Sequence, residues 1–210
     1  MRQIKVIIFD CDGVMFDSKK ANEAYYNAIR AHFGKPPLTK EECDYVHMQT
    51  AEESISYLFR HDLCREAALL YRRQIDYTPF IGYMKVEPYL ERLLEYIHPA
   101  YKTAISTNRS DTMAKVLVYY GLEKYFDFVV TCLDVERPKP HPESLLKILD
   151  YFNIGPDEAI YIGDSQIDEM AASAAGVPLI AYKNPSLKAA FHVSHFKEVE
   201  DLLRRLEDQR

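Results

Sequence analysis

Several residues of the types that bind cations and phosphate groups lie at or just beyond the ends of short runs of strand-forming residues. They are Asp10 and Asp12, Thr107 and Asn108, Lys139, and Asp164 and Asp168. Asp10 and Asp12 share one short loop, and two carboxylates so close together stay ionised only beside a cation or a helix N-terminus. The stretch VIIFDCDGVMFD that contains them is therefore a candidate site for charge-dependent chemistry.

The other polar residues indicate which cation and which chemistry. Asp164 offers further carboxylate oxygens, and hard oxygen ligands suit Mg²⁺, whose coordination is commonly completed by a substrate phosphate. Lys139 and Thr107 supply donors for phosphate oxygens. Taken alone, each aspartate is as well explained as a helix N-cap and Lys139 as a solvated surface lysine. Their combination predicts a site for phosphoryl transfer.

The elements that would position these residues alternate between strands and helices. Short buried strands are predicted at 4–9, 102–106, 127–131, 159–162 and 178–182. Helices are predicted at 86–97, 110–121, 141–152 and 166–176, with Gly121 and Gly176 as left-handed C-caps. This alternation predicts an α/β fold with a Rossmann-like parallel sheet and helices on both faces. In such a sheet the candidate residues converge at one edge.

One segment breaks the alternation. Residues 18–82 contain amphipathic helical segments and no convincing strand. We therefore predict an α/β core of residues 1–17 and 83–210 and an inserted all-helical cap of residues 18–82, lying over the ends of the strands as a lid. The stretch HFKEVEDLLRRLEDQR at 195–210 predicts a further amphipathic helix.

Composition restricts the function classes. The chain has 210 residues and a net charge of −6, with 32 acidic and 26 basic residues, so bulk charge recruits neither nucleic acid nor an anionic membrane. The sequence shows no signal peptide and no apolar run long enough to span a membrane. The four cysteines form no metal-binding pattern. We expect a cytoplasmic protein with reduced thiols.

The stretches DCDGVMFD, STN, KPHPE and GDSQIDEMAASAAG together resemble the four motifs of the haloacid dehalogenase superfamily. The resemblance covers residues 4 to 182, and the helical insertion is similar to the small cap of that superfamily's phosphatase branch, which includes phosphoglycolate phosphatase. The resemblance implies that Asp10 is the nucleophile that becomes an aspartyl phosphate. Asp12 would protonate the leaving oxygen and later activate water.

The resemblance also assigns the remaining residues. Thr107 would hold a phosphate oxygen, with Asn108 near the substrate, and Lys139 would neutralise charge on the nucleophile and the transferred group. Asp164 would bind Mg²⁺ together with the carboxylate of Asp10 and the backbone carbonyl of Asp12. Asp168 would bind the metal or orient Lys139. Gly13 would allow a sharp turn beneath the phosphate.

Hydrolysis of a small-metabolite phosphate monoester is the leading interpretation among the reactions of this superfamily. Asp12 disfavours dehalogenation, which has no leaving oxygen to protonate. A sugar phosphomutase of the β-phosphoglucomutase type stays an alternative, although such enzymes carry a histidine where this chain has Asn22. Phosphonate cleavage needs a cap lysine in a context that this chain lacks. A catalytically silent binding or regulatory relative stays an alternative.

Specificity is expected to lie in the cap. The stretch CDYVHMQTAEES at 43–54 resembles the loop that dips toward the site in capped relatives, so His47, Gln49 and Thr50 are predicted to contact the substrate. Further candidates for an anionic substrate are Arg60, Arg72 and Arg73. Asp17 is assigned to the hinge of the cap and Cys11 receives no function. The sequence does not predict an oligomeric state.

Overall fold

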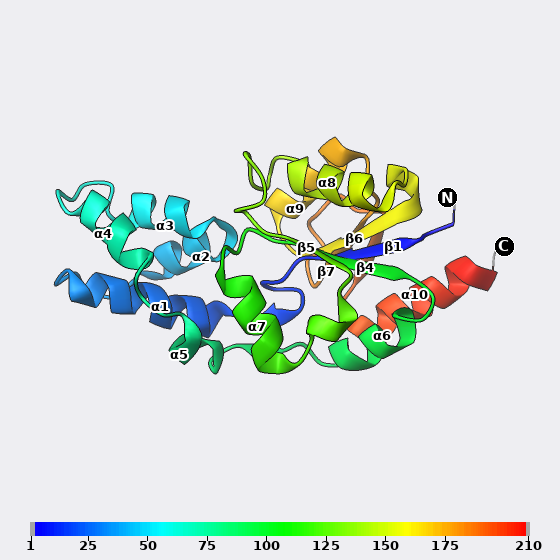
Figure 1. Cartoon of the computed structure of the whole chain (residues 1–210), viewed down its shortest axis with the longest axis horizontal. Helices are drawn as coiled ribbons and strands as arrows, with labels where there is room; N and C mark the ends of the chain where they lie inside the picture. Colours follow the sequence, from blue (N-terminus) through cyan, green and yellow to red (C-terminus); the bar gives the residue numbers. More distant parts are fainter. Residues whose placement is uncertain (1–2, 209–210) are drawn as a thin grey trace.

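The computed structural model describes residues 3–208, and within them a single parallel sheet of six strands forms the centre (Figure 1). Its strand order is β5-β4-β1-β6-β7-β8. The strands are β1 (Val6–Phe9), β4 (Lys102–Ser106), β5 (Phe128–Val130), β6 (Ala159–Gly163), β7 (Leu179–Tyr182) and β8 (Phe191–Val193). The five predicted strands are confirmed. The edge strand β8 was missed, because its short run FHV is only partly buried and carries little apolar signal.

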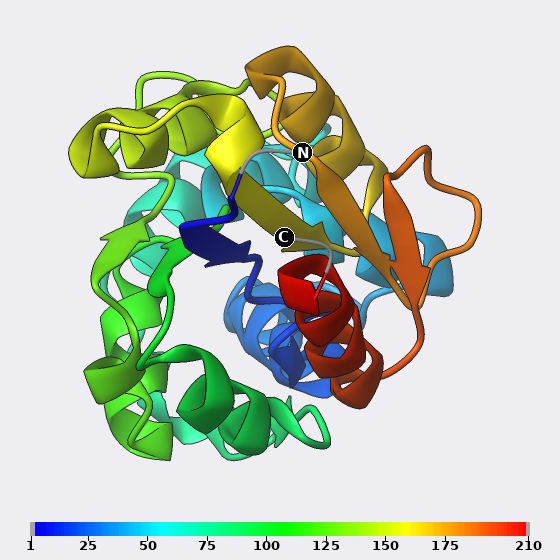
Figure 2. The same ribbon diagram turned by 90° about the vertical axis from the view of Figure 1, so that its right-hand side faces the viewer.

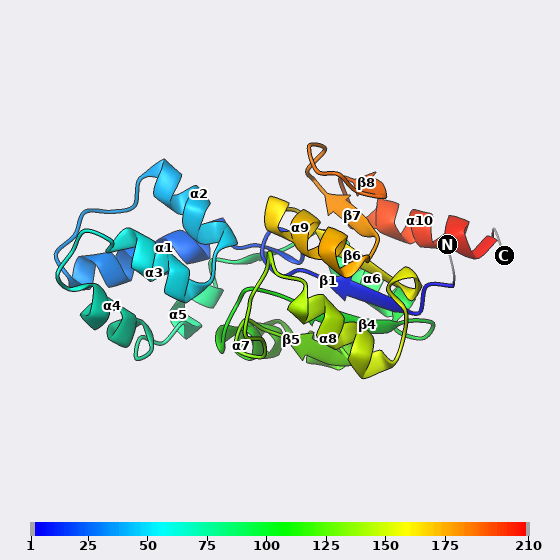
Figure 3. The same ribbon diagram turned by 90° about the horizontal axis from the view of Figure 1, so that it is seen from above.

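Helices cover both faces of this sheet, as the views in Figures 2 and 3 show. Val6 and Ile8 pack with α8 (Glu143–Phe152) and α9 (Gln166–Ala175) on one face. Ile7 and Phe9 pack on the other face with α6 (Leu90–Ile97), α7 (Thr112–Tyr120) and α10 (Phe196–Asp208). Because neighbouring side chains of a strand point to opposite faces, both sides of β1 are apolar, and the predicted Rossmann-like α/β fold is confirmed.

The ends of these helices follow their local sequence. Gly121 and Gly176 lie after α7 and α9 with φ of 65° and 70°, the left-handed conformation predicted for them. Helix α6 begins at Leu90, four residues later than predicted, because Val86 pairs with Phe16 in a short ribbon. Two short 3₁₀ turns, η1 (Glu123–Tyr125) and η2 (Pro156–Glu158), precede β5 and β6. Residues 1–2 and 209–210, which the predicted core includes, lie outside the described residues.

The helical insertion lies together at one end of the molecule, on the left in Figure 1. It contains α1 (Lys19–His32), α2 (Lys40–Met48), α3 (Ala51–Leu58), α4 (Arg65–Arg72) and α5 (Thr78–Ile81). The chain leaves and re-enters the core through an antiparallel ribbon of β2 (Phe16–Asp17) and β3 (Lys85–Val86). Asp17 is exposed in this ribbon. The division into a core of 1–17 and 83–210 and a cap of 18–82 stays a prediction.

The prediction of one loop over 43–54 was wrong. Helix α2 continues to Met48, α3 begins at Ala51, and only two residues join them. Thr50 is the N-cap of α3 and forms a capping box with Glu53, and Thr39 forms the same motif with Glu42 before α2. These two Thr-x-x-Glu motifs were the available signals for two helix starts. Within residues 3–208, none of the helices has the length and apolar character needed to span a membrane.

Candidate active site

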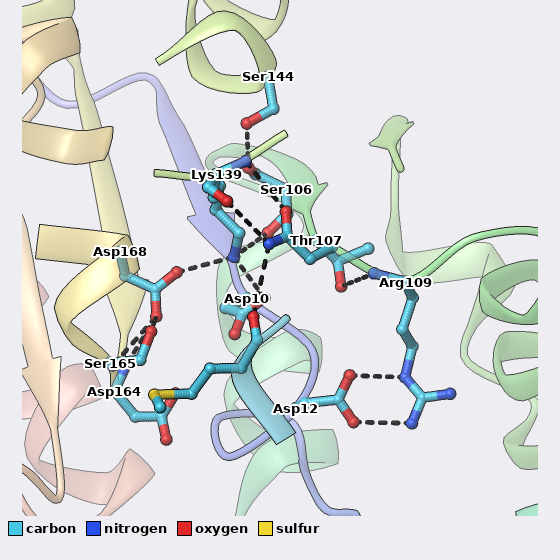
Figure 4. A network of polar contacts seen from close by, with 12 residues as sticks. Asp10, Asp12, Ser106, Thr107, Arg109, Lys139, Ser144, Asp164, Ser165 and Asp168 are labelled. Atoms are coloured by element: carbon cyan, nitrogen blue, oxygen red, sulfur yellow. Dashed lines mark hydrogen bonds and ion pairs between the residues drawn. The ribbon is translucent and has the colours of Figure 1, made fainter. Parts of the chain in front are cut away.

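The carboxyl ends of β1, β4 and β6 lie side by side and bring Asp10, Thr107 and Asp164 together (Figure 4). A pocket opens there between the core and the cap. Its lining includes Asp10, Thr107 and Asp164. The core also contributes Asp12, Asn108 and Lys139 to the lining, and the cap contributes His47, Gln49, Arg72 and Arg73. Residues from four separate strand ends thus share one pocket, because parallel strands end at the same edge of the sheet.

Lys139 is the cation nearest to Asp10. Its Nζ donates hydrogen bonds to Asp10 Oδ1 at 2.8 Å and to Asp168 Oδ1 at 2.7 Å, and only 2% of its side chain is exposed. Burial lowers the pKa of Lys139, but Asp10 and Asp168 outweigh this effect and raise it above the usual value. Lys139 is therefore a permanent positive charge beside Asp10, where it can stabilise negative charge on a transferred group.

Asp168 is fully buried and holds this lysine in place. Its Oδ1 accepts from Lys139 and, at 2.6 Å, from the hydroxyl of Tyr161. Its Oδ2 accepts from the backbone N and the hydroxyl of Ser165, at the start of α9. Burial raises the pKa of Asp168, but Lys139 and these hydrogen bonds lower it more. Both carboxylate oxygens are engaged, which favours the predicted orienting role over direct metal binding.

Asp10 and Asp164 are the carboxylates best suited to hold a cation. One oxygen each of Asp10, Asp164 and Asp168 lies within 4.8 Å of the other two. Burial raises the pKa of Asp164 to about 8, and the repulsion of Asp168 and Asp10 adds to the effect. Burial also raises the pKa of Asp10 to about 7, although Lys139 lowers it. Paired carboxylates with raised pKa values indicate that a positive charge is needed between them, and their hard oxygens fit Mg²⁺.

Gly13 provides the space for the Asp164 carboxylate. Its φ is +81°, and a Cβ at this position would overlap the carboxylate group of Asp164. Only glycine combines this backbone conformation with the absence of a side chain. The turn after Asp12 therefore brings the loop that follows β1 directly against the loop that follows β6.

Asp12 points away from Asp10 and toward Arg109, as Figure 4 shows. Arg109 Nε donates to Asp12 Oδ2 and Arg109 Nη2 to Asp12 Oδ1, both at 2.7 Å, in a two-pronged ion pair. Ser18 donates a further hydrogen bond to Asp12 Oδ1. Burial raises the pKa of Asp12, but Arg109 outweighs it and holds the pKa below the usual range. In this arrangement Asp12 is an anion and not a proton donor.

Thr107 and Asn108 occupy the loop after β4. Thr107 lines the pocket, and its Oγ1 accepts from the backbone N of Arg109 at 3.1 Å, so its hydroxyl proton is directed elsewhere. Asn108 also lines the pocket, but its side-chain amide bonds the backbone N and O of Lys139 at 3.0 and 2.9 Å. The predicted substrate contact of Asn108 is therefore accompanied by a second role, the support of Lys139.

The predicted cap residues separate into two groups. His47, Gln49, Arg72 and Arg73 line the pocket. Thr50 is absent from the pocket lining within residues 3–208, and its hydroxyl is used in the capping box with Glu53 at 2.7 Å. Arg60 lies over the ring of Tyr57, 4.1 Å from its centroid, and is likewise absent from that lining. The structure therefore gives Thr50 a capping role where a substrate contact was predicted.

Sequence reasoning missed Arg109, Tyr77 and Tyr161. Arg109 stands two residues after Thr107 in the stretch STNRS, and a basic residue in a loop that faces carboxylates was a usable signal. Tyr161 interrupts the buried strand AIYI, and a buried hydroxyl needs a hydrogen-bond partner. Tyr77 gave no such signal. Cys11 is fully buried and hydrogen-bonds to Met15 and Phe16 only through its backbone oxygen.

Comparison with known proteins agrees with this geometry. A family model described as haloacid dehalogenase-like hydrolase matches residues 7–182. Pyrophosphatase PpaX of Bacillus pumilus is 27% identical over 206 residues, covering 95% of each chain. Phosphoglycolate phosphatase of Xanthomonas campestris is 27% identical over 188 residues, covering 86% of this chain and 84% of the relative.

A solved structure extends the similarity to the whole fold. The crystal structure of a haloacid dehalogenase superfamily hydrolase, subfamily IA, variant 1, from Geobacter sulfurreducens is 41% identical and has a TM-score of 0.79. The match covers 95% of this chain and 96% of that chain, so it includes the helical insertion as well as the sheet. The chain therefore belongs to the family of haloacid dehalogenase-like hydrolases, among relatives that are named as phosphatases.

Proposed function

We propose that this protein is a Mg²⁺-dependent phosphatase that hydrolyses a small-metabolite phosphate monoester through an aspartyl phosphate on Asp10. The observation that carries the proposal is the contact between Asp10 and Lys139, at 2.8 Å, in a pocket that Thr107 and Asp164 also line. A carboxylate with a permanent cation beside it can approach an anionic phosphate, because the cation offsets their repulsion.

In the first step a carboxylate oxygen of Asp10 attacks phosphorus, and the bond from phosphorus to the leaving oxygen breaks. Asp12 gives a proton to that oxygen, so the product leaves as an alcohol or acid. This step requires Asp12, which is a carboxylate while it is paired with Arg109, to turn toward the leaving oxygen and to take up a proton from solvent before it gives that proton to the leaving group. Thr107 donates its hydroxyl proton to a phosphate oxygen, and Lys139 balances the charge on the transferred group.

In the second step Asp12, now a carboxylate, takes a proton from a water molecule. The oxygen of that water attacks phosphorus, the bond to Asp10 breaks, and inorganic phosphate is released. Asp10, Asp164 and the backbone carbonyl of Asp12 would hold the cation. When bound, Mg²⁺ supplies positive charge that neutralises the phosphate oxygens.

The proposed substrate class rests on the names of the relatives. Two relatives bear the names pyrophosphatase and phosphoglycolate phosphatase. We therefore propose that the substrate of this chain is also a small phosphorylated compound. The mutase alternative has less support, because Asn22 stands at the position of its histidine and bonds Tyr77 and His47 instead. A cytoplasmic location stays a prediction of the sequence.

The test is hydrolysis of p-nitrophenyl phosphate with and without Mg²⁺, in the wild type and in Asp10→Asn. We expect Mg²⁺-dependent release of phosphate by the wild type and a loss of at least ~10³-fold in the variant, because the nucleophile is removed. Acid quenching during turnover should trap phosphate on the wild-type chain only. Activity of Asp10→Asn equal to that of the wild type would exclude the proposed nucleophile.

A further inference from the structure

Arg109 presents the pocket with a group that is built to bind an anion. Its guanidinium makes two parallel hydrogen bonds of 2.7 Å to the oxygens of Asp12, and 6% of the side chain is exposed. Carboxylates and phosphates fit this planar fork equally well. We propose that Arg109 binds a second anionic group of the substrate, a carboxylate or phosphate near the scissile phosphate, and that the Asp12 carboxylate occupies this position in the ligand-free molecule. The inference rests on the proposed phosphatase function and names its substrate class.

The position of Arg109 matches the leaving-group side of the site. Arg109 follows Thr107 by two residues, and its backbone N donates to Thr107 Oγ1 at 3.1 Å, so one loop carries both side chains. Asp12 must reach the leaving oxygen to act, and Asp12 now contacts Arg109. Atoms of the substrate attached to the leaving oxygen would therefore lie within reach of the same guanidinium.

The charges of the pocket support an exchange of partners. When Asp12 turns toward the leaving oxygen, Arg109 loses the partner of a buried ion pair, and an unpaired buried charge is strongly unfavourable. Arg72, Arg73 and Lys115 also line the pocket, with Arg72 lying 3.9 Å from Asp111 and Lys115 pairing with Asp76 at 3.0 Å. A neutral leaving group leaves Arg109 unpaired, whereas a second anion on the substrate replaces Asp12 at the guanidinium. Substrates with two anionic groups should therefore be preferred.

Two buried donors in the same pocket lack partners among the described residues. They are Arg72 Nε and His47 Nε2. Both nitrogen atoms are themselves buried, and an anionic or polar group of the substrate that reached them would supply the acceptor that each lacks.

A chain of hydrogen bonds defines which nitrogen of His47 carries its proton. Arg109 Nη2 donates to Tyr77 Oη at 3.2 Å, and the Tyr77 hydroxyl donates to Asn22 Oδ1 at 3.2 Å. Asn22 Nδ2 then lies 3.3 Å from His47 Nδ1 and donates to it. An amide nitrogen only donates, so His47 Nδ1 is the acceptor, and Nε2 of neutral His47 carries the proton. The chain thus connects the guanidinium of the core to a free donor of the cap.

The first test compares phosphoglycolate, whose leaving group carries a carboxylate, with ethyl phosphate, a phosphate ester of similar size whose leaving group carries no charge. We expect the wild type to prefer phosphoglycolate in kcat/KM, and Arg109→Gln to reduce this preference by ~10- to 100-fold. Arg109→Lys should reduce it less, because the charge remains and the fork is lost. Arg60→Gln, outside the pocket lining, is the matched control and should keep the wild-type preference. Pyrophosphate serves as a third substrate, to separate a second phosphate from a carboxylate.

The ratio of kcat/KM on phosphoglycolate to kcat/KM on ethyl phosphate shows whether Arg109 binds the substrate or only supports Asp12. If Arg109→Gln lowers activity on both esters by the same factor, Arg109 acts only on Asp12 and the inference is wrong. A wild type with no preference for phosphoglycolate or pyrophosphate over ethyl phosphate also contradicts it. Absence of turnover on every ester would instead refute the phosphatase function.

The second test measures binding and needs no turnover. Isothermal titration gives the Kd of 3-phosphonopropionate and of propylphosphonate, two unreactive ligands of similar shape that differ by a carboxylate. The quantity compared is the Kd of propylphosphonate divided by the Kd of 3-phosphonopropionate. This ratio should be about 10-fold larger in Asp12→Asn than in the wild type, because the Asp12 carboxylate no longer competes for Arg109. Arg109→Gln should shift the relative affinity in the opposite direction. Thermal unfolding would confirm that both variants are folded. An unchanged relative affinity in both variants would overturn the inference.

Discussion

The side-chain amide of Asn108 holds the backbone of Lys139 from both sides. Asn108 Oδ1 accepts from Lys139 N at 3.0 Å, and Asn108 Nδ2 donates to Lys139 O at 2.9 Å. A side-chain amide can accept at its oxygen and donate from its nitrogen at the same time, so Asn108 satisfies both backbone groups of Lys139. The loop after β4 therefore determines where the lysine from the loop after β5 enters the site.

Replacing this amide should misplace Lys139. We expect Asn108→Leu to lower kcat on p-nitrophenyl phosphate by ~10- to 100-fold and to lower the free energy of unfolding by ~1–3 kcal/mol, because two buried backbone groups lose their partners. Urea unfolding and steady-state kinetics measure the two effects. Wild-type kcat in a folded Asn108→Leu variant would show that Lys139 is positioned without this contact.

The hydroxyl of Tyr161 should contribute to catalysis although it touches no substrate. It lies 2.8 Å from Lys139 Nζ and donates to Asp168 Oδ1 at 2.6 Å. Tyr161→Phe removes this link and should lower kcat by roughly 5- to 50-fold, with KM nearly unchanged. Tyr151→Phe, at an exposed tyrosine on α8, is the control and should leave both constants unchanged. An effect on KM alone would contradict a role through Lys139.

Gly13 should tolerate no side chain. Gly13→Ala places a Cβ against the Asp164 carboxylate, so we expect loss of Mg²⁺-dependent activity and weaker Mg²⁺ binding in a titration. Gly34 provides a matched control, because its φ is +64° and a Cβ there meets nothing within 4 Å. Gly34→Ala should have only the backbone cost of about 1 kcal/mol and retain full activity. Equal effects of the two substitutions would show that strain, and not the overlap with Asp164, explains the result.

Burial of His47 should make stability depend on pH. Burial lowers the pKa of His47 below its usual 6.5, and Asp12 offsets this only in part. The unfolded chain then binds a proton at His47 at a higher pH than the folded chain does. The free energy of unfolding should therefore decrease as the pH falls below about 6.5, until the lowered pKa of the folded state is passed.

His47→Asn removes this contribution. Urea unfolding at about pH 7.5 and pH 5 should show a larger loss of stability for the wild type than for the variant, by about 1.4 kcal/mol for each unit of the shift. The comparison between the two proteins cancels the contributions of all other titrating groups. A larger loss in the variant would reverse the sign and contradict a neutral, buried His47.

Thr50 should act on stability and not on specificity. Thr50→Ala removes the N-cap of α3, and Thr39→Ala removes the equivalent cap of α2, so each should lower the free energy of unfolding by about 1 kcal/mol. Neither substitution should change the order of preference on a panel of phosphate esters. A changed order with Thr50→Ala, but not with Thr39→Ala, would restore the substrate contact predicted from the sequence.

The sequence by itself determined the sheet and the main residues at its edge. The strand-forming runs at β1, β4 and β6 are buried on both faces, so their apolar character is continuous and easily read. Polar residues that end such strands must converge at one edge of the sheet, so the sequence alone predicts that Asp10, Thr107 and Asp164 share one site. Local motifs could also have given the starts of α2 and α3, because a capping box lies within four consecutive residues.

Only the tertiary structure decided which side chains meet inside the pocket. Asp12 and Arg109 lie 97 positions apart, so no local pattern records their contact. The direction of the Asp12 carboxylate depends on the packing of Arg109 and Tyr77 between core and cap. Partners of buried charges are selected by three-dimensional proximity, because the cost of desolvation is offset only by the groups that actually lie within hydrogen-bonding distance.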